Sequence, residues 1–384
     1  MQEISQRLQN KLTKRSVENS LRSLTQTNET VVDFFSNDYL GLAKEKVIHE
    51  DAYEKICNLE NINGSTGSRL LSGNQRIHEK FETYLSVFHQ SPSATLFNSG
   101  YDANVGFFSS VPQRGDHIFF DELVHASIRD GIKMSLASSS KFKHNDINDL
   151  KQKAAQIRHK SEEVYVVTET VFSMDGDSPN LEKLARVCAE NRLRLVLDEA
   201  HSTGVFGDLG QGFSRSMAIE GSLFARVVTF GKSLGCHGAV ILGSKSLKNY
   251  LINFARSLIY TTALSPHSVA VAYSAYQFLE ANPNLQNQLK KRIDYFNFCK
   301  STYLIEEYFF SSNSAIQSCL IADNTKAKNV SNELYIKGYH VKAILSPTVP
   351  KGKERLRFCL HSYNSIEQIQ NVLKELKEIL TKIG

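Results

Sequence analysis

The chain has 384 residues, enough for two or three domains of ordinary size and for a large hydrophobic core. Hydrophobic residues make up 41% and charged residues 22%, which excludes disordered, collagenous and coiled-coil proteins. The formal charge of +5, from 45 Lys and Arg against 40 Asp and Glu, is weak for this length and argues against a dedicated nucleic-acid binder.

Residues 1–30 are polar and predict a helix-prone arm. The start of the chain lacks the apolar stretch of a secretory signal peptide, and no apolar run reaches the roughly 18 residues of a membrane helix. We therefore expect a cytoplasmic protein with no membrane partner. Its cysteines form no CxxC pair and no zinc-finger spacing, so we expect reduced thiols and no metal site. They are Cys57, Cys188, Cys236, Cys299, Cys319 and Cys359.

The middle of the chain alternates short β-branched segments with helix-like ones. Strands are predicted at residues 164–168, 193–197, 226–230 and 238–243, and a helix at residues 181–191. Short apolar strands separated by helices predict an α/β fold with a mainly parallel sheet covered on both faces.

The pattern changes after Asn282-Pro-Asn. A helix-like stretch over residues 285–308 precedes short strands, including residues 318–321 and 356–360. The last helix starts at Ser365, which has the spacing of a capping box with Gln368. We expect a small α+β domain here.

The predicted organisation has three parts. They are an N-terminal segment over residues 1–50, a large α/β domain over residues 51–284 and a small C-terminal α+β domain over residues 285–384.

Two strand ends carry candidate chemistry. Asp198-Glu-Ala-His201 ends one predicted strand, and Lys232 follows the next. Ligands of open α/β sheets bind just past the carboxyl ends of strands, so these side chains are expected close together. An amine beside a buried carboxylate suits pyridoxal phosphate, since the lysine forms a Schiff base and the acid keeps the ring nitrogen protonated.

Asp-Glu-Ala-His is also a motif of P-loop ATPases. That interpretation needs a preceding GxxxxGK[ST] loop. The only Gly-Lys-Ser begins at Gly231, follows Asp198 and has Arg226 in place of the first glycine. A DEAH-type ATPase is therefore a remote alternative. A non-catalytic subunit is another, although Lys232 is present.

Three further segments leave two interpretations each. Residues 97–104 predict a strand end, a glycine turn and a helix start, which is an anion site or an ordinary turn. His125 is placed to stack on an aromatic ring or to serve a structural role. Residues 63–74 hold three glycines and form either a substrate-facing loop or a plain connection.

Six motifs occur in order between about residues 31 and 360. Together they resemble the α-oxoamine synthases, pyridoxal phosphate enzymes of fold type I with the aspartate-aminotransferase fold. The motifs are residues 36–42, 64–70, 125–127, 169–177, 198–204 and 229–232.

The resemblance implies a role for each matching residue. Lys232 would bind the cofactor and move protons, Asp198 would pair with the ring nitrogen, and His125 would stack on the ring. The remaining cofactor residues would be Ser173 and His201 near the phenolic oxygen, Gly100, Tyr101 and Thr229 at the phosphate, and Thr262 at the phosphate of a neighbouring subunit in a homodimer.

For the substrate, the resemblance implies Arg357 at the amino-acid carboxylate, with Asn37, Thr348 and, in the arm, Arg22. Arg355 lies two residues before Arg357, so on a regular strand both side chains face the same way. Only the resemblance favours Arg357.

Within the family, the sequence is most similar to members that condense L-alanine with a pimeloyl thioester in biotin biosynthesis. The thioester would be carried by CoA or acyl carrier protein, and CO2 and free thiol would be released. The alternatives are a serine palmitoyltransferase-like or a glycine C-acetyltransferase-like enzyme. Glu199 and Ser202 depart from the usual family pattern.

Overall fold

The computed structural model describes residues 3–24, 26, 28, 30–58, 63–157 and 161–383. The chain divides into two compact units. The larger unit comprises Asn37–Ser173 and Ser178–Asn287, and the smaller comprises the residues up to Ser36, Met174–Asp177 and the residues from Gln288. The sequence placed its boundaries at residues 50 and 284.

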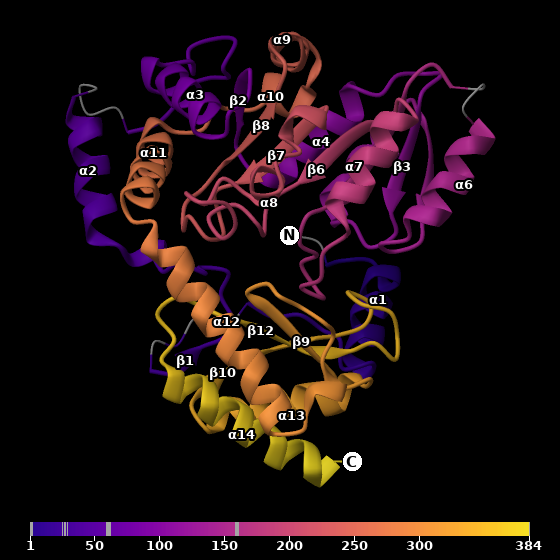
Figure 1. Cartoon of the computed structure of the whole chain (residues 1–384), viewed down its shortest axis with the longest axis vertical. Helices are drawn as coiled ribbons and strands as arrows, with labels where there is room; N and C mark the ends of the chain where they lie inside the picture. The colour runs from indigo at the N-terminus through magenta and orange to yellow at the C-terminus, as the bar shows by residue number, and fades with distance from the viewer. Residues whose placement is uncertain are drawn as a thin grey trace. The chain divides into compact units, whose positions relative to one another are not determined.

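A seven-stranded sheet forms the centre of the larger unit (Figure 1). Its order is β2-β8-β7-β6-β5-β3-β4, and only β8 runs antiparallel to its neighbours. The mainly parallel sheet predicted from the sequence is confirmed, and the four predicted strands lie within one residue of their expected bounds. The strands are β2 Ser93–Phe97, β3 His117–Asp121, β4 Ser138–Phe142, β5 Val164–Glu169, β6 Arg194–Asp198, β7 Ala225–Thr229 and β8 Ala239–Gly243.

Both faces of this sheet are buried against helices. Alternate residues of a strand point to opposite faces, so Tyr165 and Val167 of β5 join one apolar cluster while Val164 and Val166 join the other. The first cluster includes residues of α4 (Gly100–Ser110) and α5 (Ala126–Met134). The second includes residues of α6 (Ile147–Ile157) and α7 (Leu181–Glu190). This double covering explains why the strands are apolar on both sides.

The larger unit has further helices at its edges. Helix α11 packs along α2, and α10 packs on α4. These helices are η1 Leu42–Lys44, α2 Lys46–Cys57, α3 Arg76–Phe88, α8 Phe213–Ser216, η2 Glu220–Ser222, α9 Lys245–Phe254, α10 Arg256–Ile259 and α11 Pro266–Ala281.

The long helix predicted over residues 285–308 is shorter in the structure. Helix α12 spans Asn284–Thr302, and a separate 3₁₀ turn, η3, spans Glu306–Tyr308. Leu304 between them has a positive φ of 56°, a backbone conformation that ends a right-handed helix. The prediction of one continuous helix is therefore wrong beyond Thr302.

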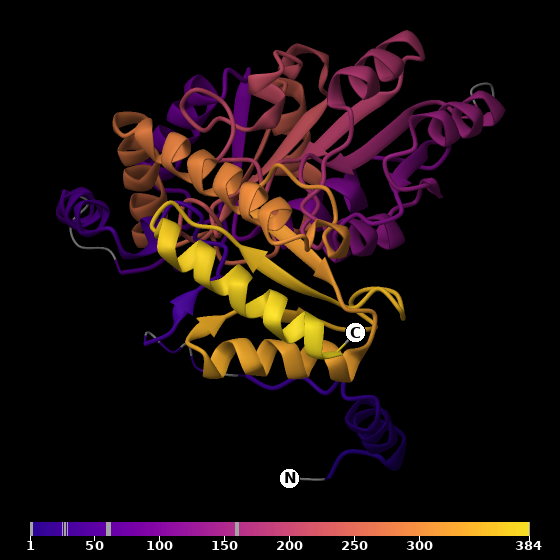
Figure 2. The same cartoon turned by 60° about the horizontal axis from the view of Figure 1, so that its bottom comes forward.

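The smaller unit contains an antiparallel sheet of order β11-β12-β9 and a two-residue parallel pairing of β1 with β10. Helices α13 and α14 lie side by side in it (Figure 2). The elements are β1 Val32–Asp33, β9 Ile316–Leu320, α13 Asn324–Ile336, β10 Tyr339–His340, β11 Lys342–Ile344, β12 Arg355–Cys359 and α14 Ile366–Ile383.

The capping box predicted at the start of α14 is present. The backbone N–H of Ser365 donates to Gln368 Oε1 at 2.9 Å, and that of Gln368 donates to Ser365 Oγ at 3.0 Å. Two N–H groups that the helix itself leaves without acceptors are thereby bonded.

Residues Met174–Asp177 belong to the smaller unit, although more than 100 residues of the larger unit separate them in sequence from Gln288. The carbonyl of Gly176 accepts hydrogen bonds from Ser312 Oγ and Ser314 Oγ, both at 2.8 Å. Gly176 has a φ of +77°, and a Cβ there would lie 2.1 Å from the carbonyl oxygen of Ile316. Glycine is therefore required for this close approach.

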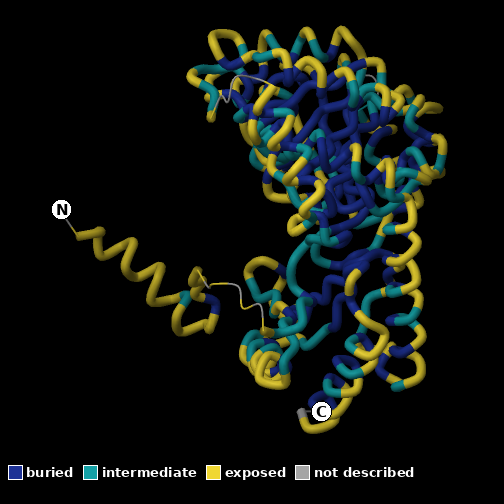
Figure 3. Tube along the Cα trace, turned by 90° about the vertical axis from the view of Figure 1, so that its left-hand side faces the viewer, coloured by how far each residue is buried: buried dark blue, intermediate teal, exposed yellow. Residues whose placement is uncertain are grey.

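Helix α1 (Gln6–Val17) forms in the predicted arm and has no buried residue (Figure 3). Across the described residues, no helix is long and apolar enough to cross a membrane. The six cysteines form no disulfide.

Candidate active site

A pocket of about 250 Å³ lies in the larger unit, where β5, β6 and β7 end. It brings together eight residues that the sequence analysis singled out. They are Asn37, Gly100, Tyr101, His125, Asp198, His201, Thr229 and Lys232.

The other predicted site residues do not line this pocket. Ser173 is half-buried in the turn after β5, and Thr262 is exposed in the turn before α11. Arg22, Thr348 and Arg357 belong to the smaller unit. There, the guanidinium of Arg22 donates to Thr348 Oγ1 at 2.9 Å.

The glycine-rich residues 63–74 are also absent from the pocket lining. Two of their hydrogen bonds are to the segment before α11. Ser65 Oγ donates to the carbonyl of Leu264 at 3.1 Å, and the N–H of Ala263 donates to the carbonyl of Gly67 at 3.0 Å.

Asp198 is the last residue of β6 and is 5% exposed. Its Oδ2 accepts a hydrogen bond from Asn104 Nδ2 at 2.8 Å, and its Oδ1 accepts from the backbone N–H of Ala200 at 2.9 Å. The two donors, one on each oxygen, fix the plane of the carboxylate. Asn104 was not predicted as a site residue, although it lies in the same segment as Gly100.

Lys232 lies in a tight turn between β7 and β8. The N–H of Gly235 donates to the carbonyl of Lys232, and that of Cys236 donates to the carbonyl of Phe230, both at 2.8 Å. Gly235 has a φ of +62°, and a Cβ there would lie 2.3 Å from the backbone nitrogen of Ala43. Gly235, three residues after Lys232, thus sets the path of the turn that carries Lys232.

His125 caps the N-terminus of α5. Its Nδ1 lies 2.8 Å from Ser127 Oγ and accepts a hydrogen bond from the Ser127 backbone N–H at 3.2 Å. Burial lowers the pKa of His125 below its ordinary value near 6.5, so the ring is neutral at pH 7. A neutral imidazole can stack on a protonated pyridine ring without charge repulsion.

His201 is oriented by a hydrogen-bond chain. Its Nδ1 lies 2.8 Å from the hydroxyl of Tyr39, which donates to Asn37 Oδ1 at 3.1 Å. Tyr39 is only 1% exposed and was not predicted as a site residue. Sequence gave no signal for it beyond its place in the motif of residues 36–42.

The N-terminus of α4 forms one end of the pocket. Ser99 Oγ accepts from the N–H of Asp102 at 3.0 Å, and the earlier N–H groups of the helix have no acceptor within it. A Cβ on Gly100 would lie 2.4 Å from Thr229 Cγ2, so β7 and the helix meet there closely. Thr229 Oγ1 is buried and has no hydrogen-bond partner among the described residues.

These features fit pyridoxal phosphate. Helix N-terminal N–H groups and an unpaired buried hydroxyl suit a phosphate. A buried carboxylate with fixed donors suits a ring N–H, and a lysine amine suits an aldehyde carbon. The pocket thus offers a partner for the phosphate, the ring nitrogen and the aldehyde of the expected cofactor.

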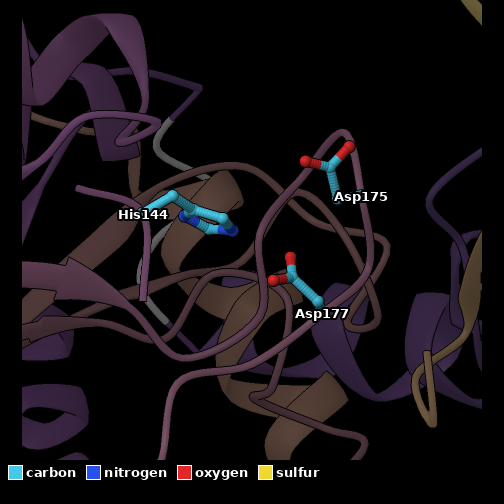
Figure 4. Close-up of side chains that lie close together, drawn as sticks. All are labelled: His144, Asp175 and Asp177. Carbon is cyan, nitrogen blue, oxygen red and sulfur yellow. The ribbon is translucent and has the colours of Figure 1, made fainter. Parts of the chain in front are cut away.

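Figure 4 draws three other titratable side chains, His144, Asp175 and Asp177. In the larger unit, His144 Nδ1 lies 2.9 Å from Asp121 Oδ1. In the smaller unit, Asp175 forms an ion pair with Arg355. His144 and Asp175 are therefore engaged within their own units, and we assign no ligand to the three.

A mainly parallel sheet with a lysine and a carboxylate at neighbouring strand ends, beside a helix N-terminus, defines a transferase of fold type I. Residues 29–376 match the family model described as aminotransferase class I and II. The 8-amino-7-oxononanoate synthase of Emericella nidulans is 37% identical over 386 residues, covering 94% of this chain and 92% of that one.

Two solved structures share this fold. The 8-amino-7-oxononanoate synthase from Francisella tularensis has a TM-score of 0.79 and 29% identity, covering 93% of this chain and 99% of that one. A serine palmitoyltransferase variant from S. paucimobilis, described with a bound PLP–myriocin aldimine, has a TM-score of 0.89 and 24% identity, covering 99% and 98%.

The chain belongs to the class I and II aminotransferase family and, within it, to the α-oxoamine synthases. The expected family, fold type I, enzymatic class and pyridoxal phosphate cofactor are confirmed at the level of this family. The DEAH-type ATPase and non-catalytic subunit alternatives are not supported, and Asp198 and His201 of that motif line the pocket instead.

Proposed function

We propose that this chain catalyses the decarboxylative condensation of L-alanine with a pimeloyl thioester. The products would be 8-amino-7-oxononanoate, CO2 and the free thiol of CoA or acyl carrier protein. One observation carries the chemistry: a single pocket is lined by Lys232, Asp198, His125 and His201. The substrates are proposed from the relatives' names and from the sequence resemblance.

Each residue is given the role that its environment supports. When bound, pyridoxal phosphate supplies an electron sink for the bonds broken at the amino-acid Cα. Lys232 would hold the cofactor and, once displaced, take the Cα proton with its amine and return it later. Asp198, ordered by Asn104, would hold the proton on the ring nitrogen.

The surrounding residues would position the cofactor. His125 would stack on one face of the ring, and Ser173 and His201 would bond near its phenolic oxygen. The N–H groups of Gly100 and Tyr101 would bind the phosphate together with the Thr229 hydroxyl.

We also propose a homodimer, in which exposed Thr262 reaches the phosphate of the neighbouring subunit. The carbonyl of Thr262 accepts from Asn98 Nδ2 at 2.8 Å, which fixes the turn that carries it. A catalytically active monomer in sedimentation and activity measurements would contradict this role. As an enzyme of biotin biosynthesis, the protein would act in the cytoplasm.

The substrate residues are proposed on the resemblance. Arg357 would bind the alanine carboxylate, with Asn37, Thr348 and Arg22 near the substrates. The side chain of Arg355 is engaged elsewhere, since it pairs with Asp175 and lies over the Phe310 ring. Arg357 is bonded as well, since its guanidinium donates to Cys359 Sγ at 2.9 Å, so the choice of Arg357 rests on the resemblance.

The cofactor role is tested with Lys232→Ala. Purified wild type should be yellow and form a borohydride-reducible adduct, whereas the variant should not. Turnover should fall by more than the roughly 10²–10⁴-fold that a general base contributes, because cofactor attachment is lost too. Lys245→Ala, at an exposed position in α9, is the matched control. A colourless wild type that binds no cofactor would overturn the proposal.

The substrates are tested by crossing L-alanine, glycine and L-serine with pimeloyl-, acetyl-, succinyl- and palmitoyl-CoA and following thiol release. Fastest turnover with alanine and pimeloyl-CoA supports the proposal. Fastest turnover with another pair assigns a different member of the same family. The serine and palmitoyl-CoA pair is included because serine palmitoyltransferase shares the fold.

A further inference from the structure

Glu169 lines the pocket, although it was not predicted as a site residue. It is the last residue of β5 and is 3% exposed. In the register of the sheet, its Cα partner on β6 is Asp198. Two carboxyl groups therefore end neighbouring parallel strands at the same pocket.

Glu169 is bonded directly to the segment that carries His125. Its Oε1 accepts a hydrogen bond from the backbone N–H of His125 at 2.6 Å. His125 is the N-cap of α5, so this N–H lies outside the helix's own hydrogen-bond ladder. Glu169 thus holds the backbone of His125 and Ser127 contacts its ring nitrogen, so the imidazole is restrained from two sides.

The charges around Glu169 oppose its ionisation. Burial and the neighbouring Asp198 raise the pKa of Glu169 to about 8, and Asp121 at the end of β3 acts in the same direction. Lys232 and the His125 N–H act in the opposite direction. With its pKa raised in this way, Glu169 holds a proton at neutral pH and adds no negative charge beside Asp198.

We propose that Glu169 is a positioning residue that fixes His125 through its backbone amide and, as a neutral acid, adds no second negative charge to the pocket. The inference rests on the proposed function, because it concerns the residues given to the cofactor. A second negative charge here would favour the protonated form of the Lys232 amine, which cannot act as a base.

Two variants separate the parts of this role. Glu169→Gln keeps the side-chain length and an oxygen that accepts from His125, but it is neutral at every pH. Glu169→Ala removes the acceptor. Thr168→Val is the matched control, since Thr168 is buried on the same strand, does not line the pocket and has a hydroxyl without a partner among the described residues.

Three readouts are compared: binding of pyridoxal phosphate to the apoprotein by fluorescence titration, thermal unfolding of the apoprotein, and kcat/KM from pH 6 to 9.5. Glu169→Ala should bind the cofactor at least about 10-fold more weakly, the cost of a lost hydrogen bond and a displaced His125. In Glu169→Gln, kcat/KM should stay within about threefold of wild type at pH 7. In wild type kcat/KM should decline above pH 8, and Glu169→Gln should not show this decline.

The inference is overturned if Glu169→Gln is as impaired as Glu169→Ala at pH 7, since a charged carboxylate would then be required. It is also overturned if Glu169→Ala binds the cofactor like Thr168→Val. If Glu169→Ala does not fold, the pH profile of Glu169→Gln decides. Failure of wild type to bind the cofactor would instead overturn the proposed function.

Discussion

Asn104 donates a hydrogen bond from its side-chain amide to Oδ2 of Asp198 at 2.8 Å, which joins helix α4 to the end of strand β6. The same amide donates to Ser127 Oγ at 3.0 Å. Asn104 is 2% exposed and lines the pocket, so it orders Asp198 from within the protein.

The Asn104→Ala variant should bind pyridoxal phosphate about 10-fold more weakly or worse, because a hydrogen bond to a charged group contributes about 1.5–3 kcal/mol. Fluorescence titration of the apoprotein measures this. Ser110→Ala removes another buried polar side chain from the same helix, away from the pocket, and should leave affinity unchanged. Equal affinities of the two variants would show that Asp198 does not depend on Asn104.

Gly235→Ala should displace the turn that carries Lys232. A left-handed backbone at a non-glycine residue costs about 1–3 kcal/mol, and the contact with Ala43 adds to it. We expect a lower melting temperature together with weaker cofactor binding. Gly221→Ala is the control, since a Cβ there meets nothing within 4 Å and its φ is not positive. If both variants behave like wild type, the turn tolerates a side chain.

His89 should make the larger unit sensitive to acid. Its Nδ1 lies 3.1 Å from the carbonyl of Gln211, and its Nε2 lies 2.9 Å from the hydroxyl of Tyr276. Burial places the pKa of His89 well below its unfolded value near 6.5. Below pH 6.5 the unfolded chain therefore binds a proton that the folded protein does not, and the free energy of unfolding falls as pH falls.

Urea unfolding from pH 7 to pH 5 measures this dependence. In His89→Gln the slope should be shallower, while stability at pH 7 should drop by about 1–3 kcal/mol from imperfect hydrogen bonding. Exposed His49→Gln should keep the wild-type slope. A slope unchanged in His89→Gln would mean that other groups cause the acid sensitivity.

Replacing Arg355 should lower the stability of the protein, whereas replacing Arg357 should weaken its binding of L-alanine. Removing Arg355 leaves Asp175 as a buried carboxylate without its partner, so Arg355→Met should lose about 3–5 kcal/mol of stability. Arg357→Met should instead raise the KM for L-alanine about 10- to 100-fold, following the strength of hydrogen bonds to a charged group. Melting temperatures and alanine titrations distinguish them. The reverse pattern would assign the carboxylate to Arg355.

Much of the central sheet could be predicted because its strands are short apolar runs bounded by polar turns. Strands β5, β6, β7 and β8 were found within one residue. The antiparallel direction of β8 was not predicted, since a strand's apolar pattern is the same in either direction. The break of the long helix at Leu304 was also missed, because that residue carries no helix-ending signal.

The residues of the candidate site likewise fall into those that the sequence marked and those that it did not. Lys232, Asp198 and His125 could be singled out because strand ends and family motifs mark them. Tyr39, Asn104 and Glu169 were not given roles, since a buried tyrosine, amide or carboxyl acquires its role only from its partner. Those partners are His201, Asp198 and the His125 backbone.

The sequence by itself determined four strands of the central sheet and the family, and it marked Lys232, Asp198 and His125 as candidates, because these depend on local apolar patterns and short motifs. Only the tertiary structure decided which carboxyl group is ordered by which donor. That outcome depends on contacts between residues as distant in the chain as Asn104 and Asp198, and on the burial that raises the pKa of Glu169 beside Asp198.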